Sequence, residues 1–334
     1  MSAMRRRQLQ LFLAVLVAGI FAGLLYSVGI GEVRPLGIAI SMAYGVLISA
    51  PIAAFETLVT NGEGRRWLRS LPLAVSLGLR VGIYSAVILT VQFGSLGHHL
   101  IGVPVDPGER DFSAVLTYSV GIAVLMNVGL EIAILIGPRT LWRFLTGRYH
   151  HPREERRFVL FVDVAGSTAA AERLGNLGIH SMLDQVFRIA SQPVLEHGGE
   201  IHSYVGDTMI VTWPETAGQH PLSCFLGIRA ALAGQARRLN AAFGLAPEVR
   251  GSLHFGSLVV GEIGDLKRSI VLQGDVMNAT ARLEAASRDV PGGFIVSDAA
   301  RLRMGTPTGL APLGELELRG RQERVTAWRL GNPA

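Results

Sequence analysis

Two acidic residues could do chemistry, because each one lies at the end of a short apolar run. Asp163 follows the run 158–162, and Asp207 lies at the Gly-Asp step of the sequence IHSYVGDTMIVTW, residues 201–213. Taken alone, each acid is more often a turn or cap residue. Mg²⁺, however, prefers hard oxygen ligands and usually needs only one or two carboxylates together with phosphates. If the two runs lie side by side as strands, the pair predicts a divalent metal site.

The residues that follow Asp163 favour a ligand that carries phosphate groups. Gly166 has no side chain, so it leaves room for a triphosphate to approach the backbone. Ser167 or Thr168 stands where the N-cap of a helix is expected, and free backbone N–H groups at a helix start attract phosphate.

The elements that must position these acids alternate between strands and helices. The strand before Asp163, the Gly-Asp hairpin and the later runs predict a βαββαβ order, an α+β ferredoxin-like fold with helices on one face of a mixed sheet. The expected strands are 158–162, the hairpin 201–213, a strand pair over 248–261, 270–272 and strands within 313–330. The expected helices are 167–195, with a break near Gly175–Gly178, then 219–243 and 276–286.

The first part of the chain has a different composition. The sequence is 49% hydrophobic and only 17% charged, and most of its apolar length lies in residues 8–137. A bilayer is crossed by about 20 apolar residues in a helix. Four stretches are long enough, and they predict an all-α membrane domain of four helices over residues 1–137, with spans at about 9–30, 36–59, 71–93 and 112–137. A cleaved signal peptide does not fit, because the first stretch is too long and a second span follows closely.

The basic residues predict the orientation of these spans. They gather before the first span, between the second and the third, and after the fourth, whereas the other two loops hold Arg34 and Arg110. By the positive-inside rule, both termini and the second half of the chain are expected in the cytoplasm of a multi-pass protein of the cell inner (plasma) membrane. Membrane lipid is therefore an expected partner.

Three charged residues fall within the expected spans, namely Glu56, Arg80 and Glu131. Such groups are costly in lipid and usually face the interior of a helix bundle. We hypothesise that Arg80 pairs with Glu56 or Glu131, and a purely structural ion pair is the simpler interpretation.

Residues 138–157 form the expected basic juxtamembrane linker, with arginine and aromatic residues interleaved, as suits the anionic inner leaflet. The net charge of +5 does not indicate nucleic-acid binding, because the basic residues cluster beside the apolar segments. The single cysteine, Cys224, excludes an internal disulfide and lies in an apolar helical pattern, so it is expected to be a buried small side chain.

Three motifs in the second half resemble those of the class III nucleotidyl cyclases, the adenylate and guanylate cyclases. FVDVAGST at 161–168 resembles the first metal motif and YVGD at 204–207 the second, while QGDVMNATARLE at 273–284 resembles the signature with a paired Asn and Arg. HFG at 254–256 and GEIG at 261–264 fit the strand pair between them. The resemblance covers about residues 156–330, and a catalytic domain is expected over 158–330.

The resemblance implies a mechanism and a set of site residues. Asp163 and Asp207 would hold two Mg²⁺ or Mn²⁺ ions, which activate the ribose 3′-hydroxyl for attack on the α-phosphorus. Asn278 would orient the ribose, and Arg282 would stabilise the transferring phosphate from the same helix face. The remaining expected nucleotide contacts are Val164, Gly166, Ser167, Thr168, Gly206 and, for the terminal phosphates, Arg319 or Arg321.

In this family the metal acids and the Asn/Arg pair come from different chains. The resemblance therefore implies a homodimer with two equivalent sites at its interface, because this one chain carries all four residues.

The residues that choose the base depart from the family pattern. Ser203 stands where adenylate cyclases usually have Lys, and Val271 stands where they have Asp or Thr. A Val side chain makes no hydrogen bond, so His202, Gln273 or backbone groups are left to read the purine. ATP is favoured because adenylate cyclases are the common bacterial type, and GTP or relaxed specificity is the alternative. A silent nucleotide-binding membrane receptor is a further alternative, against which the four intact residues argue.

Overall fold

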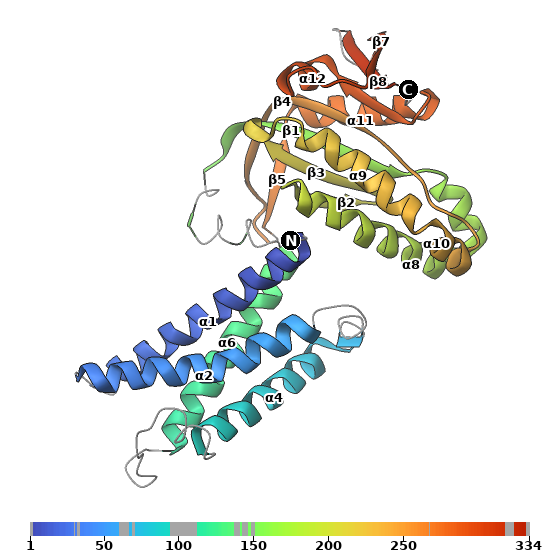
Figure 1. Cartoon of the computed structure of the whole chain (residues 1–334). Coiled ribbons are helices and arrows are strands. Elements are labelled where there is room, and N and C mark those ends of the chain that lie inside the picture. Colours follow the sequence, from blue (N-terminus) through green and yellow to red (C-terminus); the bar gives the residue numbers. More distant parts are fainter. Residues whose placement is uncertain are drawn as a thin grey trace. The chain divides into compact units, whose positions relative to one another are not determined.

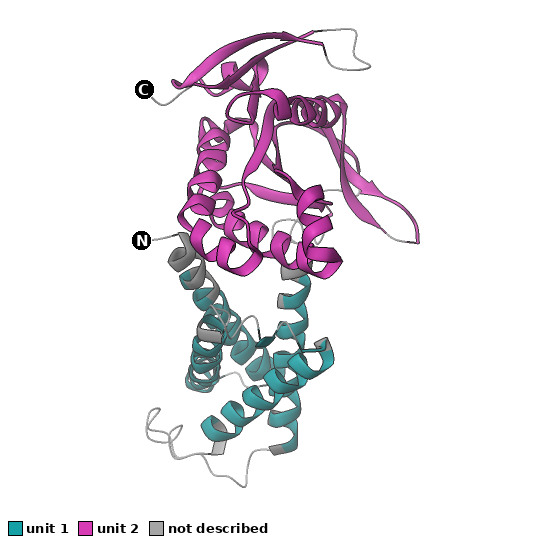
Figure 2. Cartoon of the chain, turned by 90° about the vertical axis from the view of Figure 1, so that its right-hand side faces the viewer, with its two compact units in different colours: residues 1–143 teal, residues 144–334 magenta. Residues whose placement is uncertain are grey.

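The computed structural model describes residues 3–29, 31, 34–59, 67–68, 71–93, 112–136, 141, 146–147, 151–266, 268–317 and 324–331. The chain divides into two compact units, Met1–Arg143 (unit 1) and Phe144–Ala334 (unit 2), which Figure 2 shows in different colours.

Unit 1 is built from long apolar helices. They are α1 (Ala3–Gly29), α2 (Pro35–Val59), α4 (Leu73–Phe93) and α6 (Phe112–Ile136). Within the described residues, three stretches are long and apolar enough to cross a membrane, Phe12–Gly29, Pro35–Thr57 and Ala74–Val91. The apolar stretch found in α6, Leu116–Gly129, is shorter, so the fourth predicted span is not confirmed.

Glycines let α1 and α2 approach each other closely. A Cβ atom at Gly23 would overlap the backbone of Ser41, and one at Gly19 would overlap the side chain of Ser49. Small residues at such crossings let helix backbones pack directly, which matters in lipid because apolar side chains gain nothing from leaving it.

Arg80 forms the ion pair that the sequence predicted, and it pairs with both candidate acids. Its Nη1 atom lies 3.1 Å from Glu131 Oε1 and 3.7 Å from Glu56 Oε1, and its side chain is only 8% exposed. The same nitrogen donates to Asn127 Oδ1 at 3.3 Å. Arg80 and Glu56 thus lie largely inside unit 1, as expected for ionised groups among apolar helices, whereas the Glu131 side chain is 34% exposed.

Unit 2 is an α+β unit built on one mixed sheet (Figure 1). Its strands run in the order β2-β3-β1-β4-β6-β8-β7, with β5 paired to β4. The pair β4–β6 is parallel, and the other described strand pairs are antiparallel. The strands are β1 (Arg153–Val164), β2 (Glu200–Val205), β3 (Thr208–Pro214), β4 (Val249–Ile263), β5 (Ser269–Gln273), β6 (Phe294–Ser297), β7 (Leu310–Leu316) and β8 (Val325–Leu330). The helices are α8 (Ser167–Glu196), α9 (His220–Gly234), α10 (Ala236–Phe243), α11 (Asp275–Ala286) and α12 (Asp298–Arg303).

The alternation of side chains along β1 creates two apolar layers. Phe158, Leu160 and Val162 belong to the larger core, which includes residues of α8 and α9. Val159 belongs to a second cluster with Val276 of α11. Because neighbouring residues of a strand point to opposite faces, α11 packs on the face opposite α8 and α9. The expectation that all helices cover one face was therefore wrong.

Several predicted elements differ in extent. β1 begins at Arg153, so residues 153–157 of the segment expected as linker are strand, paired with β4. The helix expected over 219–243 is two helices that meet at Gln235, and the pair expected over 248–261 is the single long strand β4. The predicted break in α8 is confirmed at Gly175, whose φ of 70° is non-helical.

Candidate active site

Asp163 and Asp207 come together at one end of the sheet. In the antiparallel register of β1 and β3, Asp163 lies opposite Thr208, so the β2–β3 turn that holds Asp207 lies beside the end of β1. The Val164 N–H donates to the Asp207 carbonyl oxygen at 3.2 Å. Asp163 is buried, whereas Asp207 is half-buried.

The first turn of α8 supports the Asp207 side chain. The helix N-cap is Gly166, with φ of 71° and no side-chain cap, rather than the expected Ser167 or Thr168. Ser167 is the first helical residue, and its hydroxyl donates to the Asp207 carboxylate. Thr168 is exposed, and Val164 is buried in the strand. The helix start thus borders the acid pair.

Gly206 gives the hairpin its tight turn. Its φ is +61°, in the left-handed region that favours glycine. The turn leaves Asp207 next in the chain, and β3 then begins at Thr208, whose hydroxyl donates to Asp163 Oδ1 at 3.1 Å.

Arg250 and Glu284 join this site, and the sequence reasoning did not find them. The Arg250 guanidinium donates to Asp163 Oδ2, and its Nε lies 3.4 Å from Glu284 Oε1. Arg250 lies directly opposite Asp163 on β4, and Glu284 lies on α11. An Arg within an apolar strand pattern was a visible signal, but its partner depends on a pairing between residues far apart in the sequence.

The electrostatics favour a cation at the acid pair. Burial raises the pKa of Asp163, the neighbouring Asp207 raises it further, and Arg250 opposes both effects. Burial also raises the pKa of Glu284, with Asp163 as a further cause. A positive ion beside Asp163 and Asp207 would relieve this repulsion.

The donor set fits Mg²⁺ or Mn²⁺. Both carboxylates are hard oxygen ligands, one at the end of β1 and the other in the adjoining β2–β3 turn. Among the described residues there is no group of three or more His, Cys, Asp and Glu side chains able to hold a metal. The protein would therefore supply two carboxylates, and water and phosphate oxygens would complete the coordination, as is usual for Mg²⁺.

Asn278 and Arg282 lie one helical turn apart on α11. Val276, Ala279 and Leu283 bury the opposite side of the helix, which leaves Asn278 exposed and Arg282 half-buried. Glu284, two residues after Arg282, contacts Arg250. Within the part of the chain that the structure describes, neither Asn278 nor Arg282 hydrogen-bonds or ion-pairs with the two aspartates.

The two expected base-reading positions lie on different strands. Ser203 of β2 follows an irregularity in the pairing with β3. The register shifts between Ile201 and Ser203, so His202 is an additional residue in β2 at this point. Burial lowers the pKa of His202, so its imidazole is neutral at pH 7. Val271 of β5 pairs with Gly261 of β4. Arg319 and Arg321 lie outside the described residues.

Comparison of the chain with known proteins identifies a matching family model and two related sequences. The family model described as "Adenylate and Guanylate cyclase catalytic domain" matches residues 150–331. "Adenylate cyclase 2" of Rhizobium meliloti (strain 1021) is 31% identical over 301 residues, covering 87% of this chain and 83% of that protein. "Adenylate cyclase 1" of the same organism is 28% identical over 233 residues, covering 66% of this chain and 33% of that protein.

A solved structure supports the fold. The structure of a bacterial light-regulated adenylyl cyclase superposes with a TM-score of 0.58 at 18% identity, covering 68% of each chain.

Proposed function

The chain belongs to the adenylate and guanylate cyclase family, which makes it a nucleotidyl cyclase, and on that premise we propose a membrane-anchored adenylate cyclase. It converts ATP to 3′,5′-cyclic AMP and pyrophosphate. The observation that carries the proposal is the pair Asp163 and Asp207 at one end of the sheet, next to the first turn of α8. The relatives that are adenylate cyclases favour ATP, whereas Ser203 and Val271 do not choose between ATP and GTP.

The residues divide the work as follows. Asp163 and Asp207 hold two Mg²⁺ or Mn²⁺ ions, which when bound activate the 3′-hydroxyl and neutralise phosphate charge. Asn278 orients the ribose so that the 3′-oxygen faces the α-phosphorus in line with the leaving group. Arg282 stabilises the charge that develops on the transferring phosphate. The new 3′-O–P bond forms as the bond to pyrophosphate breaks, and the hydroxyl proton goes to solvent.

We propose that the active form is a homodimer. The lack of contact between α11's Asn278 or Arg282 and the aspartates, noted above for the described residues, is what a site shared by two chains requires. Asn278 is exposed, so it is available to a second chain. In a two-fold dimer each chain gives acids to one site and the Asn/Arg pair to the other.

The apolar helices support membrane anchoring. We propose a membrane domain over 1–137, a basic linker over 138–157 and a cytoplasmic catalytic domain over 158–330. Both termini face the cytoplasm, as the distribution of arginine predicts.

The test is a cyclase assay with the purified full-length protein. Mn²⁺ with ATP should yield cyclic AMP and pyrophosphate, and the same assay with GTP measures base choice. Asp207→Asn should abolish the product, whereas Asp184→Asn, on the exposed side of α8, should leave it unchanged. Cyclic GMP alone would make the protein a guanylate cyclase. A folded protein that makes neither product would refute the enzyme, and an active Asp207→Asn variant would refute the site.

A further inference from the structure

Glu284 has no role in the reaction as proposed, although its carboxylate lies close to the acid pair of its own chain. It belongs to α11, two residues after Arg282, and its side chain is only 11% exposed. Its Oε1 atom lies 3.4 Å from Arg250 Nε, while Arg288 attracts it from beyond ion-pair distance. Among the described residues, Arg250 is therefore the one side chain that pairs with this carboxylate.

Arg250 divides its donors between Glu284 and Asp163. Its Nη2 atom donates to Asp163 Oδ2, while its Nε atom faces Glu284. The other oxygen of Asp163, Oδ1, accepts from the Thr208 hydroxyl at 3.1 Å. Both oxygens of Asp163 are thus engaged by side chains of the same chain, and one of these side chains is a cation.

The three charged side chains meet on one face of the sheet. Asp163 lies on the same face of β1 as Val159, because alternate residues of a strand share a face, and Val159 packs with Val276 of α11. Arg250 lies directly opposite Asp163 on β4. The guanidinium can therefore exchange one acid for the other by a rotation of its side chain, without a movement of the strand or of the helix.

A divalent metal ion and the Arg250 guanidinium compete for Asp163. Both are cations that need the same carboxylate, and two cations held next to it repel each other. Arg250 must therefore weaken its contact with Oδ2 before Asp163 can bind a metal ion fully. The cost of this displacement depends on the acid that receives the guanidinium, and Glu284 already lies 3.4 Å from it.

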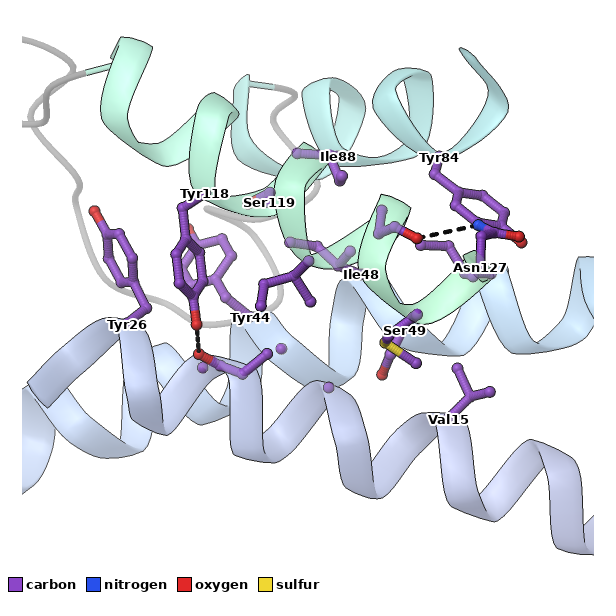
Figure 3. Close-up of a pocket in the computed structure, with 18 of the residues that line it drawn as sticks. Val15, Tyr26, Tyr44, Ile48, Ser49, Tyr84, Ile88, Tyr118, Ser119 and Asn127 are labelled. Atoms are coloured by element: carbon purple, nitrogen blue, oxygen red, sulfur yellow. Dashed lines mark hydrogen bonds between the residues drawn. The ribbon is translucent and has the colours of Figure 1, made fainter. Parts of the chain in front are cut away.

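Unit 1 contains another arginine between two acids, and its surroundings differ. Arg80 donates to Asn127 Oδ1 at 3.3 Å, and the Tyr84 hydroxyl donates to one of the two acids. Asn127 is held in turn by a hydrogen bond of 3.1 Å to the Ala123 carbonyl oxygen (Figure 3). Neutral groups from several helices thus fix that arrangement. In the described structure no neutral group hydrogen-bonds to the Glu284 carboxylate, so Glu284 is free to follow Arg250.

We propose that Glu284 is a positioning residue that strengthens metal binding at the acid pair by drawing Arg250 away from Asp163. The inference rests on the proposed function, because it takes Asp163 as a metal ligand. Without metal, Arg250 is shared between the two acids, and with metal it pairs with Glu284 alone. Loss of the Glu284 charge leaves Arg250 to Asp163, so the metal ion then competes against a stronger pair.

The test measures Mn²⁺ binding to the full-length protein in lipid nanodiscs, without nucleotide. Because a bound ion stabilises the folded state, the thermal unfolding midpoint rises with Mn²⁺ concentration. Glu284→Gln keeps the size of the side chain and removes its charge, and it should raise the half-maximal Mn²⁺ concentration about tenfold. Glu284→Asp restores the charge and should recover most of the affinity. Glu196→Gln, at the exposed end of α8, is the matched control and should behave as the parent.

Asp207→Asn separates this inference from the proposed function. It should remove the rise of the midpoint, since it removes one of the two metal carboxylates. A rise that persists in Asp207→Asn would refute the metal site, and the role of Glu284 with it. A rise that is lost in Asp207→Asn but is unchanged in Glu284→Gln would refute the role of Glu284 alone.

A double-mutant cycle with Arg250→Met tests whether Glu284 acts through the arginine. In that background Glu284→Gln should change the half-maximal Mn²⁺ concentration by at most about threefold, because no guanidinium remains to be drawn away. A direct attraction between Glu284 and the ion would give the same change in both backgrounds, and this result would overturn the proposal. Glu284→Asp does not depend on the folding of Arg250→Met, and its failure to recover the affinity would also overturn it.

Discussion

Arg250 contacts two carboxylates that come from different elements of unit 2, Asp163 of β1 and Glu284 of α11. Its side chain is 19% exposed, while those of Asp163 and Glu284 are 3% and 11% exposed. A guanidinium presents several donors in a planar fork, so it can contact both acids at once. Arg250 is thus a partial substitute for the positive charge that a metal ion would bring to Asp163.

Arg250→Met should destabilise the protein by about 3 kcal/mol, because it leaves a buried carboxylate without its cation. Thermal and urea unfolding of the full-length protein, followed by circular dichroism, measure the change. Mn²⁺ should stabilise Arg250→Met more than the unsubstituted protein, since the metal replaces the missing charge. The exposed Arg237→Ala on α10 is the control. Equal stability of Arg250→Met and the parent would show that the contacts of Arg250 with the two carboxylates do not stabilise the fold.

Cys224 should be chemically silent in the folded protein. Burial raises the pKa of its thiol to about 12, so almost no reactive thiolate is present at pH 8. Ellman's reagent should therefore label it only after unfolding in urea. Burying the neutral thiol contributes to the stability of the fold, and this contribution is fully present below about pH 8.5, the pKa of the thiol in the unfolded chain. This contribution is lost as the pH rises toward about 12. Rapid stoichiometric labelling of the native protein would show that Cys224 is accessible.

The two aspartates could be predicted from the sequence, whereas their basic partner could not. Asp163 follows a short apolar run, and Asp207 follows a glycine in a turn, so local pattern identified both. Arg250 meets Asp163 through strand register, which no local pattern encodes.

At the scale of elements, the β2–β3 hairpin sets the position of Asp207. Gly206 in this turn adopts φ of +61°, in the left-handed region that favours glycine. The pairing of β2 with β3 shifts at His202, just before Ser203. Such a bulge re-aims the side chains beside it, so it decides on which face of the sheet the Ser203 side chain lies.

Gly206→Ala should cost about 1–2 kcal/mol, because a β-carbon is unfavourable in the left-handed region. The turn should also shift Asp207, so the Mn²⁺ concentration needed for half-maximal cyclase activity should rise. Gly206→Asn is the matched variant, because Asn tolerates this conformation and should retain most of the metal affinity. Equal metal dependence of the Ala variant and the parent would show that the turn conformation is not needed.

Elements with strong local signals were predicted, and those fixed by their neighbours were not. The strand before Asp163, the long helix after it and the hairpin have clear apolar patterns and glycine boundaries. The start of β1 is charged and is strand because it pairs with β4. The strand β6 spans Phe294–Ser297, too short for a periodic pattern, and its place between β4 and β8 makes it a strand.

At the scale of the whole molecule, the proposed shared site predicts complementation between two inactive variants. Co-expressed Asp207→Asn and Arg282→Ala should recover about a quarter of the parent activity, because half of random dimers are mixed and each has one intact site. Co-expression of Asp163→Asn with Asp207→Asn is the control and should recover nothing, since each site then lacks one acid. The assay measures cyclic nucleotide formed by the purified mixed dimers. Equal recovery of activity in both mixtures, or no recovery in either mixture, would rule out sites shared between chains.

The parallel pair β4–β6 has a consequence for how the protein is synthesised. β4 takes β1 as its neighbour on one edge, but β6, its neighbour on the other, leaves the ribosome only after β5 and α11. Chains grow at about 5–20 residues per second, so the part of this edge that pairs with β6, Gly251–Leu253, waits for seconds without its partner, although β5 pairs with the end of the same edge earlier. An unpaired strand edge is a template for aggregation. The nascent catalytic unit should therefore depend most on chaperones in the interval between the synthesis of β4 and that of β6.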